Sequence, residues 1–191
     1  LHYRNACLAT TWGELNDYPN ITLDLVRQQF SRQTDPMTGG RQMVNHYDHR
    51  DLGLLPVQSP VGMQLGKAAG FAKGLKLKGV TDGGVVSIIG DGTTAEGDLH
   101  EAMTAASVWD LPLIVMVTNN KVAISTSPEE GHGIRSMKKY AEAFGFAYGE
   151  CDGGDFWDVY RTTLAAATYT RERQMPFLML VDNLPRLNAH S

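Results

Sequence analysis

One stretch near the middle of the chain constrains the fold most, because apolar runs and polar turns alternate in it. An apolar run over residues 85–89 ends in Gly90-Asp91-Gly92, a helical pattern covers residues 96–109, and a second apolar run over residues 113–117 ends in Asn119-Asn120. This order predicts a strand, a helix and a second strand, joined as a βαβ unit. In a parallel sheet both turns lie at the same edge, where ligands bind.

The two turns carry groups that suit a hard cation. Asp91 offers a carboxylate and Asn120 an amide oxygen, while Gly90 and Gly92 let a phosphate or a metal approach the backbone closely. Mg²⁺ prefers such oxygen ligands and completes its shell with phosphate and water. The helix that starts after Gly92 adds N–H groups and a positive dipole end for an anion. Either turn alone is a common loop, but together, each closing a buried strand, they indicate a Mg²⁺-diphosphate site.

The same two turns resemble the thiamine diphosphate signature, in which Gly-Asp-Gly is followed, after a helix and a strand, by Asn-Asn. The surrounding text, EGDLHEAMTAASVWDLPLIVMVTNN followed by AIST, resembles the α subunit of the 2-oxo acid dehydrogenase first component, of the branched-chain (2-oxoisovalerate) or pyruvate type. The resemblance runs from Tyr3-Arg4 to His190-Ser191. It implies an α/β fold with a parallel sheet flanked by helices, the thiamine diphosphate-binding fold. Residues 1–191 are expected to form a single diphosphate-binding domain, as a fragment of a longer chain.

The resemblance also implies roles for individual residues. A Mg²⁺ site is expected on Asp91, Asn120 and the main-chain carbonyl of Val122. His190 lies in a tail, residues 184–191, that resembles the start of the family's flexible active-site loop, and it is expected to be the catalytic residue. The positions expected to bind the cofactor are Tyr3, Arg4, Ser59, Val61, Gly90, Asp91, Gly92, Thr93, Asn120, Val122 and Ile124.

Segments outside the βαβ unit are expected to complete the site. By resemblance, Tyr3-Arg4 contacts the diphosphate, and Ser59 and the carbonyl of Val61 contact the aminopyrimidine ring. Residues 31–58 are rich in loop-forming residues and are expected to be an active-site insertion, with His46-Tyr47 near the substrate.

The activity that the resemblance implies is oxidative decarboxylation of a 2-oxo acid, with branched-chain acids favoured, and acyl transfer to a lipoyl group on the acyltransferase core. Thiamine diphosphate and Mg²⁺ are the implied cofactors. The activating glutamate is expected from a β subunit or a fused β-like pyrimidine-binding region, because nothing in these residues resembles that domain. Two alternatives stay open: the α subunit of a pyruvate or acetoin dehydrogenase, and a non-catalytic α/β module that retains the fold.

Several positions depart from the family's pattern. Thr118 stands where branched-chain members often carry an arginine, so one expected diphosphate contact is missing. Gln58 and Met63 stand at positions where the family often builds a potassium site. In the tail, Asn188 or Ala189 replaces one member of the usual histidine pair. These departures motivate the non-catalytic alternative.

Composition excludes other classes of function. The net charge is −4 at pH 7, so no overall basic field favours nucleic acid or an anionic membrane, and no apolar run has membrane-spanning length. Cys7 and Cys151 are expected to be free thiols in a reducing, cytoplasmic compartment. His46, Asp48 and His49 cluster in sequence but lack the regular ligand spacing of a zinc site.

Helical patterns are expected before the βαβ unit. Residues 1–30 predict two helices, the second starting after Asn20 as N-cap. A third helix is expected to run to about Leu77, with Ser59 as N-cap and Pro60 at its first position.

After the βαβ unit, residues 125–134 predict a loop in which His132 is either a solvated histidine or a catalytic acid. The aromatic side chains of Phe156, Trp157 and Tyr160 are expected in the core. Further elements are expected as helices over residues 136–144 and 156–173 and as strands over residues 146–150 and 177–181.

Overall fold

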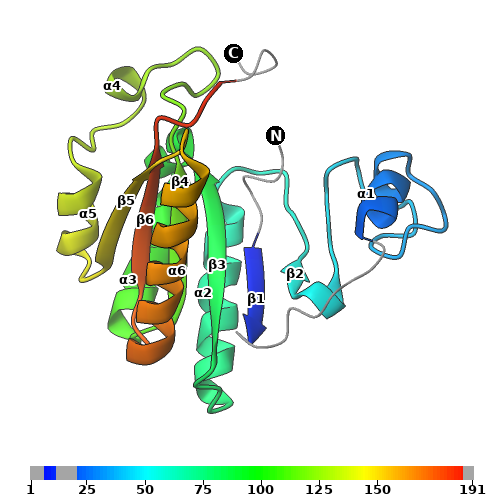
Figure 1. The fold of residues 1–191 in the computed structure, drawn as a ribbon, viewed down its shortest axis with the longest axis horizontal. Helices are drawn as coiled ribbons and strands as arrows, with labels where there is room; N and C mark the ends of the chain where they lie inside the picture. The colour runs from blue at the N-terminus through cyan, green and yellow to red at the C-terminus, as the bar shows by residue number, and fades with distance from the viewer. Residues whose placement is uncertain (1–6, 12–20, 187–191) are drawn as a thin grey trace.

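The computed structural model describes residues 7–11 and 21–186, and six strands form one sheet at its centre (Figure 1). The strands are β1 (Cys7–Thr11), β2 (Leu54–Leu55), β3 (Gly83–Gly90), β4 (Leu113–Thr118), β5 (Ala147–Asp152) and β6 (Phe177–Asp182). Their order in the sheet is β2-β1-β3-β4-β6-β5. Strands β3, β4, β6 and β5 are parallel, whereas β1 runs antiparallel to both β2 and β3.

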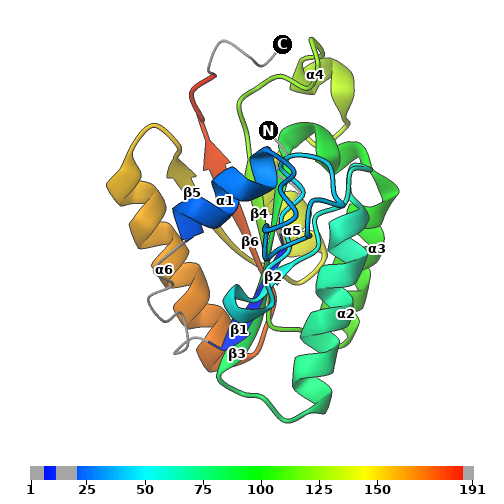
Figure 2. The same cartoon turned by 90° about the vertical axis from the view of Figure 1, so that its right-hand side faces the viewer.

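Helices cover both faces of this sheet, which confirms the expected α/β class. Figure 2 shows α6 on one face and α2 and α3 on the other. The helices are α1 (Ile21–Gln29), α2 (Met63–Leu77), α3 (Gly97–Val108), α4 (Pro128–Gly131), α5 (Met137–Ala143) and α6 (Phe156–Arg173), with short 3₁₀ helices η2 (Arg50–Leu52) and η3 (Asp91–Ala95). No helix in these described parts of the chain is both long and apolar enough to cross a bilayer.

Each face of the sheet has its own core, because successive side chains of a strand point to opposite faces. In β4, Leu113, Val115 and Val117 pack with the buried side chains of α2 and α3. Ile114 lies in the second core with Ala166 of α6. β4 therefore reads as a continuous apolar run, as a parallel strand buried on both faces should.

The expected helix from Ser59 starts four residues later than predicted. α2 begins at Met63 and is preceded by Gly62, whose φ of 88° is in the left-handed region that glycine tolerates. The Ser59 hydroxyl cannot serve as N-cap because it lies 2.6 Å from Nε2 of His46. The predicted end at Leu77 is confirmed.

The prediction of two helices in residues 1–30 is half wrong. The second helix starts at Ile21, as expected after Asn20. Residues Cys7–Thr11 instead form β1, which pairs antiparallel with β3. A long-range pairing with the edge of the sheet has overridden the local helical pattern there.

The prediction that Phe156, Trp157 and Tyr160 belong to the core is wrong. Their side chains are 70%, 63% and 53% exposed. α6 buries the face that carries Ala166 and Thr170, and the aromatic residues lie on the opposite face of the same helix. The remaining elements lie within about two residues of their predicted bounds, except that residues 125–134 contain the short helix α4.

Asp155 caps α6, and its loss should destabilise the fold. Its Oδ1 accepts hydrogen bonds from the backbone N–H groups of Trp157 (2.8 Å) and Asp158 (3.3 Å). We expect Asp155→Ala to lower the free energy of unfolding by about 1 kcal/mol in a urea titration, and Asp155→Ser to retain most of it. Asp82→Ala, at an exposed aspartate outside the helices, is the control. An unchanged midpoint for Asp155→Ala would show that the cap contributes nothing.

Candidate functional site

The two turns predicted to form the site lie side by side at the carboxyl edge of the sheet. β3 and β4 are parallel neighbours, and their last paired residues are Gly90 and Thr118. The turn after each strand therefore starts at the same level. Asp91 and Asn120 are 5% and 4% exposed, so both polar side chains are held inside the protein rather than in solvent.

A close approach between the turns explains one of the signature glycines. A Cβ atom placed on Gly92 would lie 2.6 Å from Cβ of Ala123, a distance that real Cβ atoms do not tolerate. Glycine is therefore required where the first turn meets the second. Thr94 fixes the first turn by donating its hydroxyl to the carbonyl oxygen of Asp91 at 2.7 Å, and Thr93 is also buried.

The α-helix after the first turn begins at Gly97, within one residue of its predicted start at residue 96. Residues Asp91–Ala95 form the 3₁₀ helix η3, and α3 starts only at Gly97. The first amide groups after Gly92 therefore belong to a 3₁₀ turn. The N–H groups and the positive dipole end of α3 therefore lie one 3₁₀ turn further along the chain than Gly92.

The second turn holds a strained backbone. Lys121, Ile124 and Ser125 have φ values of 61°, 47° and 67°, a region that non-glycine residues rarely occupy. Two backbone hydrogen bonds between Ala123 and Thr126, of 2.9 and 3.1 Å, close this segment. Positive φ values in non-glycine residues cluster at functional sites, because only a surrounding structure that fixes them can maintain them. The side chain of Ile124 is 83% exposed.

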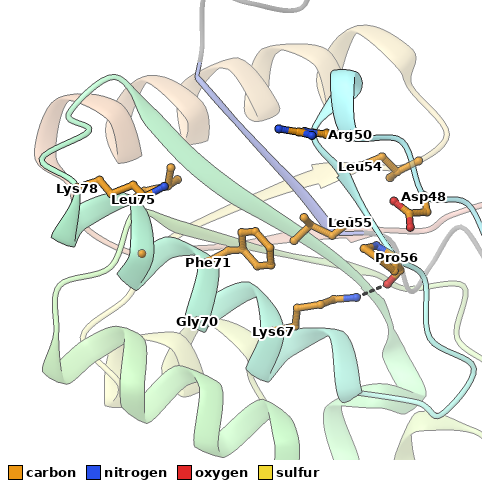
Figure 3. Close-up of a pocket in the computed structure, with 12 residues that line it drawn as sticks. Asp48, Arg50, Leu54, Leu55, Pro56, Lys67, Gly70, Phe71, Leu75 and Lys78 are labelled. Carbon is orange, nitrogen blue, oxygen red and sulfur yellow. Dashed lines mark hydrogen bonds between the residues drawn. The ribbon is translucent and has the colours of Figure 1, made fainter. Parts of the chain in front are cut away.

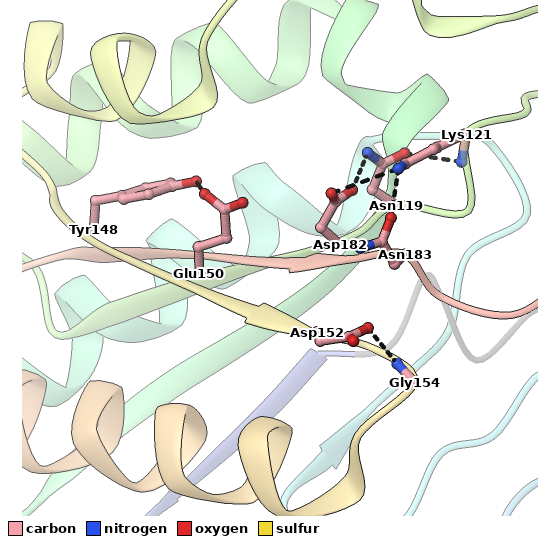
Figure 4. A network of polar contacts seen from close by, with 8 residues as sticks. All are labelled: Asn119, Lys121, Tyr148, Glu150, Asp152, Gly154, Asp182 and Asn183. Atoms are coloured by element: carbon pink, nitrogen blue, oxygen red, sulfur yellow. Dashed lines mark hydrogen bonds and ion pairs between the residues drawn. The ribbon is translucent and has the colours of Figure 1, made fainter.

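A polar network anchors the second turn to β6 (Figure 4). Nδ2 of Asn119 donates to Oδ1 of Asp182 at 2.7 Å, and Oδ1 of Asn119 accepts from the backbone N–H of Lys121 at 2.9 Å. The ammonium group of Lys121 lies 3.7 Å from Oδ2 of Asp182 and donates to Asn183. Sequence reasoning missed Asp182, although an acidic residue directly after an apolar strand was a readable signal.

The main chain next to Asn120 is also positioned. The backbone N–H of Val122 donates to Oδ1 of Asn120 at 3.3 Å, and Val122 is buried. This contact holds Val122 close to Asn120, and the carbonyl that was expected to bind a metal belongs to the next peptide group along the chain.

The Ser59 segment is held by the loop-rich region. Nε2 of His46 lies 2.6 Å from the Ser59 hydroxyl, and Nδ1 lies 3.1 Å from the carbonyl oxygen of Val44. Gly62 packs against the first residues of α3, since a Cβ there would meet Cβ of Asp98 at 3.3 Å. Val61 is half-exposed. Residues 59–62 therefore lie beside the start of α3, next to the edge that carries Asp91.

Other predicted positions have a structural role or lie outside the structure. The hydroxyl of Thr118 donates to the carbonyl oxygen of Ile89 at 2.9 Å, so this residue links β4 to β3. Gln64 donates to the carbonyl oxygen of Ile88 at 3.3 Å. Outside the described residues lie Tyr3, Arg4, His190 and Ser191.

The donor set at this edge fits a hard cation with a diphosphate. One carboxylate (Asp91), one amide oxygen (Asn120) and one main-chain carbonyl (Val122) are the oxygen ligands that Mg²⁺ takes when phosphate and water supply the rest. Within the described residues there is no group of three or more His, Cys, Asp or Glu side chains that could hold a metal.

Of two cavities in the structure, one lies at this edge of the sheet and the other does not. A cavity of about 400 Å³ opens beside Asp91 and is lined among others by Lys121, His132, Arg135 and Asp182. A larger one of about 850 Å³ lies between α2 and β2, where Figure 3 shows apolar side chains such as Phe71. The larger cavity contains none of the predicted site residues.

Burial changes the acidity of two groups on β5. It raises the pKa of the Cys151 thiol from 9.0 to about 11, with the carboxylate of Asp158 adding to the effect. Burial and a hydrogen bond to Glu150 (2.7 Å) also raise the pKa of Tyr148. Cys151 is a protonated, weakly nucleophilic thiol at neutral pH.

Comparison with known proteins agrees with this interpretation of the geometry. A family model described as "Dehydrogenase E1 component" matches residues 3–191. The chain is 35% identical over 159 residues to the mitochondrial 2-oxoisovalerate dehydrogenase subunit alpha of Dictyostelium discoideum, which covers 82% of this chain and 35% of that protein. It is 30% identical over 168 residues to the 2-oxoisovalerate dehydrogenase subunit alpha of Bacillus subtilis. This match covers 88% of this chain and 50% of that protein.

Pyruvate-type proteins match as well. The chain is 33% identical over 139 residues to the pyruvate dehydrogenase E1 component subunit alpha of Rickettsia typhi, which covers 73% of this chain and 40% of that protein. The chain thus spans about a third to a half of the length of these curated relatives.

The contact between the two turns predicts a rescue experiment. Gly92→Ala places a methyl group against Ala123, and overpacking of this kind costs about 1–3 kcal/mol. We expect a lower thermal unfolding midpoint and weaker Mn²⁺ binding, measured by electron paramagnetic resonance. In Gly92→Ala/Ala123→Gly the clashing methyl is gone, and both properties should recover. If the double variant is as impaired as Gly92→Ala, the contact is not what requires the glycine.

The raised pKa of Cys151 predicts a dependence of stability on alkaline pH. A thiol that holds its proton more tightly when folded stabilises the folded state below pH 9, and this advantage is lost between pH 9 and about 11. The free energy of unfolding should therefore fall over that interval. Cys151→Ala should show a shallower fall, and an unchanged slope would contradict the assignment to Cys151.

Proposed function

Since the chain belongs to the dehydrogenase E1 component family, we propose that it forms the α-type half of a thiamine diphosphate-dependent 2-oxo acid dehydrogenase. The reaction is oxidative decarboxylation of a 2-oxo acid, with branched-chain acids favoured, followed by acyl transfer to a lipoyl group. The convergence of Asp91 and Asn120 at one buried edge, with Gly92 at the closest approach of the turns, carries this proposal.

The described residues hold and orient the cofactor. Asp91, the amide oxygen of Asn120 and the carbonyl of Val122 bind Mg²⁺, and the backbone of Gly90, Gly92 and Thr93 approaches the diphosphate. Because the two polar side chains are already buried, binding orders them little further. Thiamine diphosphate, when bound, supplies the nucleophile and the electron sink for decarboxylation.

Other residues complete the binding of the cofactor and the substrate. Ser59, held by His46, and the carbonyl of Val61 orient the aminopyrimidine ring. Tyr3 and Arg4 bind the diphosphate, and an arginine fork suits a pair of phosphate oxygens. His190 donates a proton or stabilises charge near the substrate.

The proposed partners are a β subunit, or a fused β-like pyrimidine-binding region, and a lipoyl-bearing acyltransferase core. The names of the relatives support this, because each is called a subunit alpha. The β region supplies the glutamate that activates the cofactor, and the chain is inactive without it.

Pyruvate is the second candidate substrate, because a pyruvate dehydrogenase subunit is among the relatives at similar identity. The two substrates are separated by measuring carbon dioxide release with the β partner and the lipoylated core present. A higher kcat/KM for 2-oxoisovalerate supports the branched-chain assignment, and a higher value for pyruvate overturns it.

Cofactor binding tests the site itself. We expect calorimetric titration of thiamine diphosphate with Mg²⁺ to show binding when the β partner is present, and Asp91→Asn to weaken it at least about tenfold, since a carboxylate ligand of the metal is lost. Asp82→Asn makes the same exchange just before the opposite end of β3 and should bind as the unchanged protein does. Absence of binding in the unchanged protein with its partner would refute the proposal.

A further inference from the structure

A third cavity, which contains none of the expected metal ligands, has basic side chains in its lining. It has a volume of about 860 Å³ and lies between η3, α3 and the segment that joins α4 to α5. Its lining includes His100, His132, Arg135 and Lys139 and no aspartate or glutamate. In a chain with a net charge of −4, a cavity whose formally charged lining residues are Arg135 and Lys139 departs from the average surface.

The aromatic wall of this cavity is ordered. The Tyr140 hydroxyl and Nδ1 of His100 are hydrogen-bonded at 3.1 Å, and the two rings meet edge to face with centroids 5.3 Å apart. The ring of Phe144 also packs edge to face against His100, with the ring centroids 5.7 Å apart. Burial raises the pKa of Tyr140 to about 12, so its hydroxyl stays neutral at physiological pH. The wall therefore offers an aromatic surface with a fixed polar group.

The positively charged side chains of this cavity have few carboxylates close to them within the described part of the protein. Among the described residues, neither Arg135 nor Lys139 forms an ion pair with a carboxylate. Glu129 lines the neighbouring cavity beside Asp91; hydrogen bonds from its own backbone and from the Ser127 side chain chiefly lower the pKa of its carboxyl, and Arg135 and His132 add a smaller effect. Nδ1 of His132 is buried and makes no hydrogen bond within the described part of the chain.

Like charges held close together repel one another, and a bound anion removes that repulsion. A phosphate group carries about two negative charges and three acceptor oxygens, and it suits an arginine fork together with a lysine point charge. The volume far exceeds that of inorganic phosphate and falls in the range of small-molecule sites. An organic body attached to the phosphate would fill the rest.

We propose that this cavity binds an organic phosphate ester, with the phosphate between Arg135 and Lys139 and the organic body against Tyr140 and Ile134. His132 also lines this cavity. The cavity shares His132, Ile134 and Arg135 with the smaller cavity beside Asp91, so a ligand here lies next to the metal edge without using its ligands. The proposal goes beyond thiamine diphosphate binding and does not depend on it.

The test uses the full chain in buffer with EDTA, which removes Mg²⁺ and so keeps the metal edge out of the measurement. Phenyl phosphate and inorganic phosphate are titrated while backbone amide resonances are followed by NMR. We expect saturable shifts in residues 131–140, and tighter binding of phenyl phosphate because its ring packs on Tyr140. Equal affinity of the two probes would overturn the placement of the organic body.

Matched variants separate a site from a general charge effect. Arg135→Gln/Lys139→Gln should weaken phenyl phosphate binding at least about tenfold, since both charge-assisted contacts are lost. Arg171→Gln/Lys78→Gln makes the same two exchanges on exposed residues of α6 and at the end of α2, and should change affinity less than twofold. Equal weakening by both pairs, or no saturable binding, would overturn the proposal. Failure of this test leaves the thiamine diphosphate assignment untouched, because that site is measured with Mg²⁺.

Discussion

The parallel pairing of β3 with β4 is the interaction on which the rest of the site depends. Its register sets Gly90 opposite Thr118, so that two turns far apart in sequence leave the sheet at one level. The crossover helix α3 packs on the sheet and keeps the strands parallel. A slip of one residue would reverse the faces of every side chain in β4 and would move Asn120 away from Asp91.

The close packing of the two turns is maintained although it strains the backbone of the second turn. Three non-glycine residues in the second turn have positive φ, and each such conformation costs of order 1–3 kcal/mol. The hydrogen bonds of Asn119 to β6 and the bridge between Ala123 and Thr126 offset part of it. Gly92 removes the one atom that would prevent the turns from meeting. The same geometry brings a carboxylate and an amide together out of water.

The parts of this arrangement that sequence reasoning could predict are those encoded locally. Periodicity over residues 85–117 predicts the βαβ unit, and α6 has its predicted bounds. Prediction fails where contacts between residues far apart in the sequence determine the local structure. The strand Cys7–Thr11 depends on pairing with β3, and Ser59 loses its capping role to His46. A helical pattern shows that α6 has two faces, but not that the sheet would cover the face opposite Phe156, Trp157 and Tyr160.

Asn119 accepts a hydrogen bond from the backbone N–H of Leu184 at 3.0 Å and donates its own N–H to Val181 at 2.9 Å. The chain leaving β6 is therefore hydrogen-bonded to the turn after β4 on both sides of Asp182. The carbonyl oxygen that accepts from Leu184 belongs to the peptide group that joins Asn119 to Asn120. The exit from β6 and the turn that carries Asn120 thus form one hydrogen-bonded unit, in which the position of each segment constrains the other.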